Sequence, residues 1–223
     1  MKIALLGSGK TGSKILENKK HFVKVFNTAN KPTLNKLKNF DVVISFLPGD
    51  AFKNYIPLLM GSKLPVVVGS TGFTWPKNFN NTLKKNKLRW IYASNFSIGM
   101  VLIKNIVLKI SEAKKLFSDY KIMINETHHI HKKDKPSGTA LSIEKWIDEE
   151  CSIKSIRIGD VIGSHELIFK TTSEEIKVSH NAMDRKLFAD GAIWSAEYIL
   201  KNKKFGLYNF SDIVEKNFTL KQK

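Results

Sequence analysis

Residues 2–12 run Lys2-Ile-Ala-Leu-Leu6 and then Gly7-Ser-Gly-Lys-Thr-Gly12, and this stretch determines the fold expected for the first part of the chain. A short apolar run is typical of a strand buried in a parallel sheet, and residues 13–17 after the glycines favour a helix. The pattern G-x-G-x-x-G allows a tight turn, lets a pyrophosphate approach the backbone, and lets helix and strand pack closely. It therefore predicts a dinucleotide-binding turn made by Gly7, Ser8, Gly9, Lys10, Thr11 and Gly12.

The same turn contains Gly9-Lys10-Thr11, which raises the alternative of a P-loop. That motif, G-x-x-x-x-G-K-T, requires a glycine five positions before Gly9. Ala4 stands there instead, inside the expected strand, so the P-loop alternative fails.

After this turn, strand-like and helix-like segments alternate as far as residue 96. Apolar, β-branched runs lie at residues 22–26, 41–46, 65–69 and 89–92, and residues 51–60 are compatible with a helix. Strands that alternate with helices favour a parallel sheet with helices on its faces. We expect an α/β fold with an N-terminal Rossmann-like, doubly wound parallel sheet in residues 1–96.

From residue 97 onward the pattern changes. Ser97 can cap a helix that continues to about residue 117, and further helices are expected at 137–150 and 188–200. Strands are expected at 121–126, 153–158, 164–170 and 175–178, with a polar loop at 127–135. These segments predict a C-terminal α+β domain with a mixed open sheet in residues 97–204. Residues 205–223 are expected to pack back on the first domain.

The chain of 223 residues has 37 Lys+Arg against 20 Asp+Glu, a formal net charge of +17. Residues 1–96 hold 16 basic and 3 acidic residues and so carry +13 of this charge. Only Arg89, Arg157 and Arg185 are arginines, whereas base recognition and bidentate phosphate recognition favour arginine. A lysine-rich solvated surface, with a polyanionic ligand of the first domain, therefore explains the charge better than a nucleic-acid partner.

Two simple features of the sequence indicate the cellular compartment in which the protein works. A lone cysteine, Cys151, cannot form an internal disulfide. The apolar run of residues 3–6 is too short for a signal peptide or a membrane span. We expect a folded cytoplasmic protein that does not bind membranes.

The densest group of chemically active side chains is Glu126-Thr-His-His-Ile-His-Lys-Lys-Asp-Lys-Pro-Ser-Gly-Thr-Ala140. Clustered histidines also occur in solvated loops and in metal sites, but the lysines here oppose a divalent cation, so no metal is expected. The run ends at a helix start, Ser137-Gly138-Thr139, whose free N–H groups and hydroxyls can bind a substrate carboxylate. Histidine and lysine beside it can supply a proton.

Residues 126–140 resemble the signature of the 4-hydroxy-tetrahydrodipicolinate reductase family, also called dihydrodipicolinate reductase. Gly69-Ser-Thr-Gly-Phe73 is similar to the G-T-T-G-F of that family, and Ala93-Ser-Asn-Phe-Ser-Ile-Gly99 to its A-x-N-F-S-x-G. Arg157-Ile-Gly-Asp-Val-Ile-Gly-Ser-His165 resembles its R-x-G-x-x-x-G-x-H. His180, Arg185, Phe188, Gly191 and Ala192 then follow in its order.

The resemblance implies reduction of 4-hydroxy-tetrahydrodipicolinate (dihydrodipicolinate) to tetrahydrodipicolinate with NADH or NADPH, in diaminopimelate and lysine biosynthesis. It implies His128 as the proton donor or acceptor and Lys132 as a second acid. His129, Ser137, Gly138 and Thr139 would bind the dicarboxylate substrate. It also implies a homotetramer, with residues 97–204 serving substrate binding and oligomerisation.

The resemblance also implies a set of residues that hold the nicotinamide half of the cofactor: Gly69, Ser70, Thr71, Ala93, Ser94, Asn95 and Phe96. Asn27 ends the second expected strand, where an acid would normally bond the ribose 2′-hydroxyl of NAD. Asparagine does not repel a 2′-phosphate and Lys31 lies nearby, so NADPH is allowed as well as NADH.

Three departures from the family pattern concern the cofactor loops: Asn27, Ser70 in place of a threonine, and Phe46-Leu-Pro48 without the usual threonine. A structural role explains three further residues as well as a catalytic role does. Arg157, His165 and His180 could each be a hydrogen-bond or ion-pair partner inside the second domain, so no catalytic role is assigned to them. Two other functions stay open, a Rossmann oxidoreductase acting on an amino acid and a basic nucleic-acid-binding module. The second predicts interleaved arginine and aromatic residues, a pattern that the sequence lacks.

Overall fold

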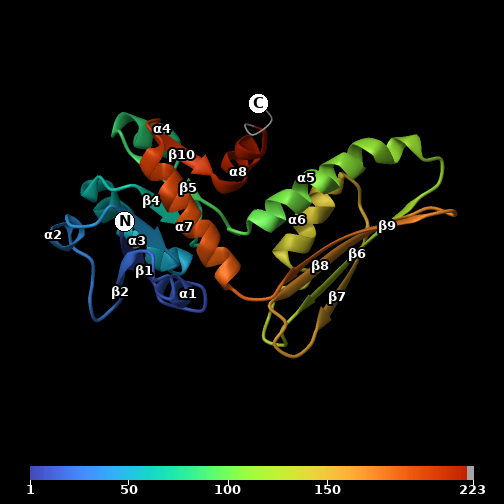
Figure 1. Ribbon diagram of the computed structural model, residues 1–223, viewed down its shortest axis with the longest axis horizontal. Helices are drawn as coiled ribbons and strands as arrows, with labels where there is room; N and C mark the ends of the chain where they lie inside the picture. The colour runs from blue at the N-terminus through green and yellow to red at the C-terminus, as the bar shows by residue number, and fades with distance from the viewer. Residues whose placement is uncertain (220–223) are drawn as a thin grey trace. The chain divides into compact units, whose positions relative to one another are not determined.

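The computed structural model describes residues 1–219 (Figure 1). The chain forms two compact units, Met1–Ser97 with Arg185–Lys223 and Ile98–Asp184. Of the tail expected to pack on the first domain, residues 220–223 lie outside the described part.

The first unit is built on a six-stranded sheet, sheet A, in the order β10-β5-β4-β3-β1-β2, with every neighbouring pair parallel. Its strands are β1 (Lys2–Leu6), β2 (Phe22–Phe26), β3 (Val42–Ser45), β4 (Val66–Val68), β5 (Arg89–Tyr92) and β10 (Gly206–Asn209). The chain steps outward from β1 to β2 and then returns to β3 on the other side of β1. The carboxyl ends of β1 and β3 therefore mark a topological switch point, where doubly wound sheets bind ligands.

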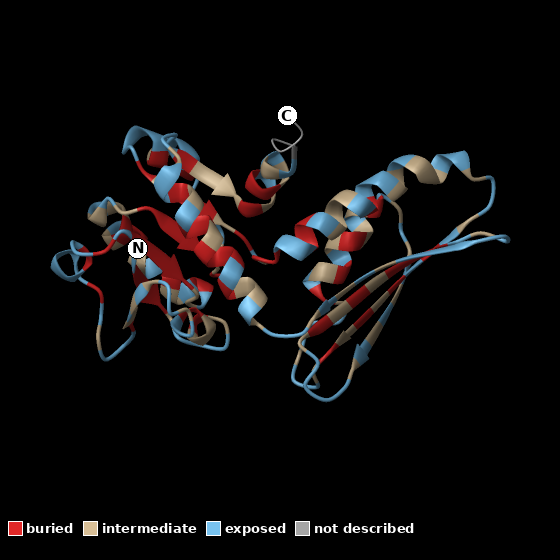
Figure 2. Cartoon of the chain, viewed as in Figure 1, coloured by how far each residue is buried: buried red, intermediate tan, exposed pale blue. Residues whose placement is uncertain are grey.

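Except for α8, which follows the last strand, the helices of this unit lie between its strands in sequence, as the alternating pattern predicts. They are α1 (Gly12–Leu16), α2 (Leu34–Leu37), α3 (Gly49–Ser62), α4 (Phe79–Lys85), α7 (Lys186–Lys201) and α8 (Phe210–Thr219). Strands β3 and β4 are buried along their whole length, in keeping with their Val and Ile residues, to which Ser45 at the end of β3 is the exception (Figure 2). Aromatic rings fill the adjoining core, where the Trp90 ring meets those of Phe52 and Phe79 with centroids 6.2 and 5.2 Å apart.

Helix α7 belongs to the first unit, whereas the sequence placed it in the second domain at 97–204. The helix contacts α1 and strands β3, β4 and β5. At its C-terminal end the Arg89 guanidinium donates to the Asn202 carbonyl at 2.6 Å. These long-range contacts explain why an amphipathic pattern alone assigned the helix to the wrong side of the boundary, which lies at residues 184–185.

The second unit contains a mixed four-stranded sheet, sheet B, in the order β7-β6-β8-β9. Strand β6 (Lys121–His128) runs parallel to β7 (Ser152–Arg157) and antiparallel to β8 (Gly163–Lys170), which pairs antiparallel with β9 (Glu175–Ala182). Helices α5 (Ile98–Ala113) and α6 (Gly138–Ile147) and the short 3-10 helix Lys114–Leu116 complete the unit. Alternate β6 and β8 side chains pack with α6 in one apolar core.

Two expectations about element boundaries were wrong. Strand β6 continues through Thr127 and His128, which the sequence assigned to a loop, and β9 continues four residues beyond Val178. The tail also contributes a strand, β10, to the edge of sheet A. Among the described helices, each is too short or too polar to cross a membrane.

Candidate functional site

The predicted cofactor residues all follow parallel strands of sheet A. The glycine turn follows β1, Asn27 follows β2, the segment from Gly69 to Thr71 follows β4, and the segment from Ala93 to Phe96 follows β5. Because carboxyl ends of parallel strands share one edge of the sheet, the topology brings these segments to the same edge.

The glycine turn has the geometry that a pyrophosphate requires. Gly7 has a φ of +89°, which glycine adopts without strain. A Cβ on Gly12 would lie 2.1 Å from the Gly7 carbonyl oxygen, so only glycine lets α1 begin this close to β1. Gly9 has open space where its Cβ would be, which leaves its backbone accessible. The turn therefore fits a dinucleotide.

Asn27 is held in a tight turn after β2. Its side-chain oxygen accepts from the Asn30 N–H at 2.9 Å, and its own N–H donates to the Asn30 carbonyl at 3.2 Å. The Lys36 ammonium donates to the Asn30 side chain at 2.8 Å and to the Lys31 carbonyl at 3.0 Å. The Lys36 ammonium, at the start of α2, is thus fixed against the same turn that holds the uncharged Asn27, an arrangement that tolerates a 2′-phosphate.

The segment after β4 depends on the absence of a side chain at Gly69. A Cβ there would lie 2.4 Å from the Phe46 ring, so Gly69 lets that ring cover the backbone. The hydroxyl of Ser70 is buried and lies 3.1 Å from that of Ser45. The Phe46 ring also packs against Phe96, with centroids 6.2 Å apart, and so connects the segments after β3, β4 and β5.

The segment after β5 is fixed by a hydrogen bond and a close helix crossing. The Asn95 side chain accepts from the Ser97 N–H at 2.8 Å. Helix α7 passes so near Phe96 that a Cβ on Gly191 would lie 1.8 Å from the Phe96 carbonyl oxygen. Gly191 therefore sets the position of this segment.

In the second unit, polar side chains gather at one end of the buried face of sheet B. Glu126 and His128 are two residues apart on β6 and thus share that face. The strand register pairs Glu126 with His165 on β8 and His128 with Arg157 on β7. Glu126, His128 and His165 are all buried.

Glu126 is a carboxylate with both oxygens engaged. One oxygen accepts from the Arg157 guanidinium at 2.8 Å, and the other lies in a short hydrogen bond with Nδ1 of His128. Burial alone would raise the pKa of Glu126, but hydrogen bonds from Arg157, Ser155 and His128 hold it at about 2. Glu126 is therefore ionised at neutral pH.

The pKa of His128 lies below its ordinary value of 6.5. Burial is the main cause, the carboxylate of Glu126 opposes it, and the charges of Lys132 and Arg157 lower the pKa further. Since Nδ1 is bonded to Glu126, Nε2 is the ring nitrogen left to meet a substrate.

His165 supports the start of α6. Its Nε2 lies 3.2 Å from the hydroxyl of Ser137, which caps α6 by accepting from the Ala140 N–H at 3.2 Å. Burial, together with the charge of His128, lowers the pKa of His165 to about 4, so the ring is neutral and can accept the Ser137 proton. Gly138 and Thr139 occupy the first two positions of α6, where helix N–H groups lack intrahelical partners.

Lys132 and Asp134 lie in the loop before α6. The Lys132 ammonium is 2.9 Å from the Asp134 carboxylate. The pKa of Asp134 is lowered mainly by this hydrogen bond, with a smaller contribution from the backbone N–H of Gly138. The lysine and the helix start therefore already hold a carboxylate between them. His129, half-buried, follows β6, and its carbonyl accepts from the Lys132 N–H at 3.1 Å.

Glu126, His128 and His165 also place one possible metal-ligand atom each within 4.8 Å of one another. However, Arg157 takes one oxygen of Glu126, and the charge of Lys132 lowers the pKa of both histidines. Two cations in the cluster oppose a divalent ion, so the geometry favours proton transfer over metal binding.

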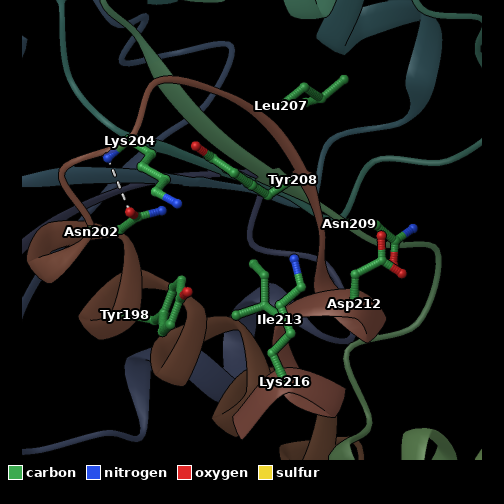
Figure 3. Close-up of a pocket in the computed structure, with 9 residues that line it drawn as sticks. All are labelled: Tyr198, Asn202, Lys204, Leu207, Tyr208, Asn209, Asp212, Ile213 and Lys216. Atoms are coloured by element: carbon green, nitrogen blue, oxygen red, sulfur yellow. Dashed lines mark hydrogen bonds between the residues drawn. The ribbon is translucent and has the colours of Figure 1, made fainter.

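A hollow of about 280 Å³ lies elsewhere in the first unit, between α7, β10 and α8 (Figure 3). Its lining includes Tyr198, Asn202, Tyr208 and Asp212, and none of the residues predicted to bind cofactor or substrate.

Sequence reasoning did not propose Glu126, Asp134 or Gly191 as functional, and left Arg157 and His165 unassigned. Glu126 had a usable signal, since its two-residue spacing from His128 places both on one face of a strand. For Gly191 the resemblance to the family was the available signal, because the carbonyl that it contacts is 95 residues away in sequence.

The glycine turn at the switch point of a doubly wound sheet makes the first unit a Rossmann-type nucleotide-binding domain, and the second unit adds a buried acid–base cluster. Together they define the class of two-domain nicotinamide-dependent oxidoreductases. Residues 19–96 match the family model "Dihydrodipicolinate reductase, N-terminus", and residues 99–214 match "Dihydrodipicolinate reductase, C-terminus". The chain belongs to the dihydrodipicolinate reductase family.

Sequence comparison with individual relatives supports the same family. The chain is 38% identical to the 4-hydroxy-tetrahydrodipicolinate reductase of Thermosipho africanus over 80% of both chains. It is 36% identical to that of Rickettsia bellii over 99% of this chain and 98% of the relative.

Solved structures show the same fold. A dipicolinate-bound dihydrodipicolinate reductase from Paenisporosarcina superposes with a TM-score of 0.76 at 23% identity, over 96% of this chain and 99% of that one. A C. glutamicum DAP dehydrogenase in complex with DAP superposes with a TM-score of 0.57 at 9% identity, over 100% and 99%.

Proposed function

We propose that the protein reduces 4-hydroxy-tetrahydrodipicolinate to tetrahydrodipicolinate with NADH or NADPH, as a step of diaminopimelate and lysine biosynthesis. The observation that carries the proposal is the run of residues 126–140, which has the signature of the family and folds into a buried Glu126–His128 pair near a helix N-terminus.

The bound cofactor supplies a hydride from its reduced nicotinamide. In this proposal the glycine turn, from Gly7 to Gly12, holds the pyrophosphate, and Asn27 faces the adenosine ribose. The segments after β4 and β5 hold the nicotinamide half. The open backbone at Gly9 and the fixed positions of Ser70 and Asn95 support these assignments.

The substrate is a cyclic dicarboxylate, and we assign one of its carboxylates to the start of α6. Ser137, Gly138 and Thr139 present a capped helix N-terminus, and Lys132 and His129 lie in the loop before it. Asp134 supports this assignment because its own carboxylate is already bound by Lys132 and the Gly138 N–H. Charge-assisted hydrogen bonds of this kind recognise carboxylates strongly.

His128 supplies the proton, with Lys132 as a second acid. In the protonated imidazole Nδ1–H binds Glu126, so Nε2–H is the acidic proton that faces substrate. Burial lowers the pKa of His128, which makes the imidazolium a stronger acid. The lysine charge nearby acts in the same direction.

The activity is tested by oxidation of NADH and of NADPH with the substrate generated in situ. The wild-type protein should turn over, whereas His128→Ala and Lys132→Ala should lower kcat by about 10²-fold or more, the range of general acid catalysis. Full activity in both variants would refute the roles assigned here. Oxidation of diaminopimelate or aspartate instead would favour the amino-acid dehydrogenase alternative.

We also propose a homotetramer assembled through the face of sheet B opposite α6. Met123 and Ile156 on that face are apolar side chains that are 37% and 39% exposed, and a second copy of the chain would cover them. Light scattering of the full chain should give four times the mass of one chain, 25.3 kDa. Met123→Glu should dissociate the assembly. The half-buried free thiol of Cys151 suits a cytoplasmic location.

A further inference from the structure

The candidate proton donor His128 is one end of a network of three hydrogen-bonded side chains. The network runs from Arg157 on β7 to Glu126 and His128 on β6. Its two hydrogen bonds end on different oxygens of the Glu126 carboxylate, which has 0% side-chain exposure.

Arg157 is itself fixed from two further directions. Its guanidinium donates to the Asp134 carbonyl at 2.6 Å and to the Ile156 carbonyl at 2.8 Å. Because the guanidinium is held by backbone, it fixes the Glu126 carboxylate, and the carboxylate in turn fixes the plane of the His128 ring. The hydrogen bond from Arg157 to the Asp134 carbonyl also connects these three side chains to the loop that carries Lys132.

We infer that Glu126 is a positioning residue for proton transfer: it binds Nδ1 of His128 so that Nε2 carries the reacting proton, and Arg157 holds Glu126 in place. This inference rests on the proposed function, in which His128 is the acid. A carboxylate bonded to the second nitrogen of an imidazole fixes its tautomer and stabilises the imidazolium.

A purely structural role for this cluster is less well supported. The parallel ladder already joins β6 to β7, so the ion pair is not needed to hold the strands together. A buried ion pair also contributes little net stability after desolvation, compared with apolar residues of the same volume. A buried carboxylate that binds both an arginine and a histidine is instead well placed to fix the tautomer and the orientation of the histidine ring.

The charges around His128 predict the direction of a pH effect. The ring faces Glu126 on its own strand, Arg157 on β7, His165 on β8, and Lys132 in the loop before α6. Glu126 is the one negative charge of this set, so its neutralisation lowers the pKa of His128. An opposite charge at hydrogen-bond distance shifts a pKa by about 1 unit or more.

The test compares Glu126→Gln and Glu126→Ala with a matched control, Glu166→Gln. Glu166 neighbours His165 on β8 but lies on the opposite face of sheet B, where it accepts from the Asn125 amide at 3.0 Å. In each protein kcat and KM are measured against pH. The side-chain nitrogens of His128 are observed by NMR, with the His128→Gln protein used for assignment.

In Glu126→Gln the basic limb of the kcat profile should move about 1 unit to lower pH, so kcat above the pKa of His128 falls about 10-fold. KM for the substrate should change less than about 3-fold, since no binding group is removed. Glu126→Ala should lower kcat further because the ring also loses its orientation. Glu166→Gln should keep the wild-type pH dependence of kcat, because its carboxylate lies on the other face of sheet B from His128.

The NMR measurement keeps the inference testable even where a variant does not fold. Wild-type His128, when neutral, should carry its proton on Nδ1, and a proton on Nε2 would overturn the inference. An active wild type whose Glu126→Gln variant keeps the same pH profile would also overturn it. An inactive wild type, in contrast, refutes the proposed function itself.

Discussion

Gly191→Ala tests how helix α7 positions the segment after β5. The new Cβ would lie 1.8 Å from the Phe96 carbonyl oxygen, 2.9 Å from its carbonyl carbon and 3.2 Å from its Cβ. Two of these atoms are backbone, so no side-chain rotation relieves the contact. Either α7 or Phe96 must move by about 1.5 Å to restore ordinary van der Waals separation.

The cost of this movement is about 3 kcal/mol, the upper end of overpacking in a close-packed interior. Alanine recovers up to about 1 kcal/mol through its higher helix propensity. The net loss in unfolding free energy should therefore be about 2 kcal/mol. Because the shift displaces Phe96, which we assign to the cofactor site, KM for NAD(P)H should rise as well.

Gly61→Ala in α3 is the matched control. Its Cβ would meet the Leu34 side chain at 3.4 Å, an ordinary contact, so the propensity gain should appear unopposed as about 0.5–1 kcal/mol of added stability. The free energy of unfolding of both variants is measured by urea denaturation and compared with that of the wild type at equal m-values. If Gly191→Ala were as stable as the wild type, with an unchanged KM, the argument for a tight helix crossing would be refuted.

Three further predictions concern single side chains. The pKa of His165 is about 4 in the folded protein against an ordinary value of 6.5, so the unfolded chain takes up a proton at higher pH than the folded protein does. The free energy of unfolding should therefore fall by about 3 kcal/mol as the pH drops from 6.5 to 4. His165→Gln should flatten this dependence of the unfolding free energy on pH. Gly163→Ala places a Cβ 3.1 Å from Nε2 of His128 and should lower kcat about 10-fold with little change in thermal unfolding. Asn27→Asp preserves the turn to Asn30 but adds a charge that repels a 2′-phosphate, so KM for NADPH should rise about 10-fold relative to NADH.

Local patterns were enough to predict the parallel sheet formed by residues 1–96. The apolar runs that became β1, β3, β4 and β5 are short, β-branched and bounded by turn residues, and the structure confirms a doubly wound parallel sheet. Strand β10 was not predicted because its four residues have no such pattern. It is a strand because its backbone pairs with β5, a contact more than 110 residues distant in sequence.

The end of β6 shows why the candidate site was only partly predictable. Thr127 and His128 are polar, so sequence alone favoured a loop, yet the strand continues because its backbone pairs with β7 as far as His128 and because Arg157 satisfies the buried Glu126. Those partners come from another strand. Propensity cannot supply them, whereas the motif alone was enough to name His128 as a candidate.

Strand β10 has a consequence for the order in which the two units fold during synthesis. The first unit is interrupted by the whole of the second, so β5 keeps an open edge until residues 206–209 leave the ribosome. The second unit is a continuous segment and can fold as soon as it emerges, whereas the first must wait. A fragment ending at Ser97 would carry that bare edge permanently and should aggregate, so the nucleotide-binding half cannot be prepared by simple truncation.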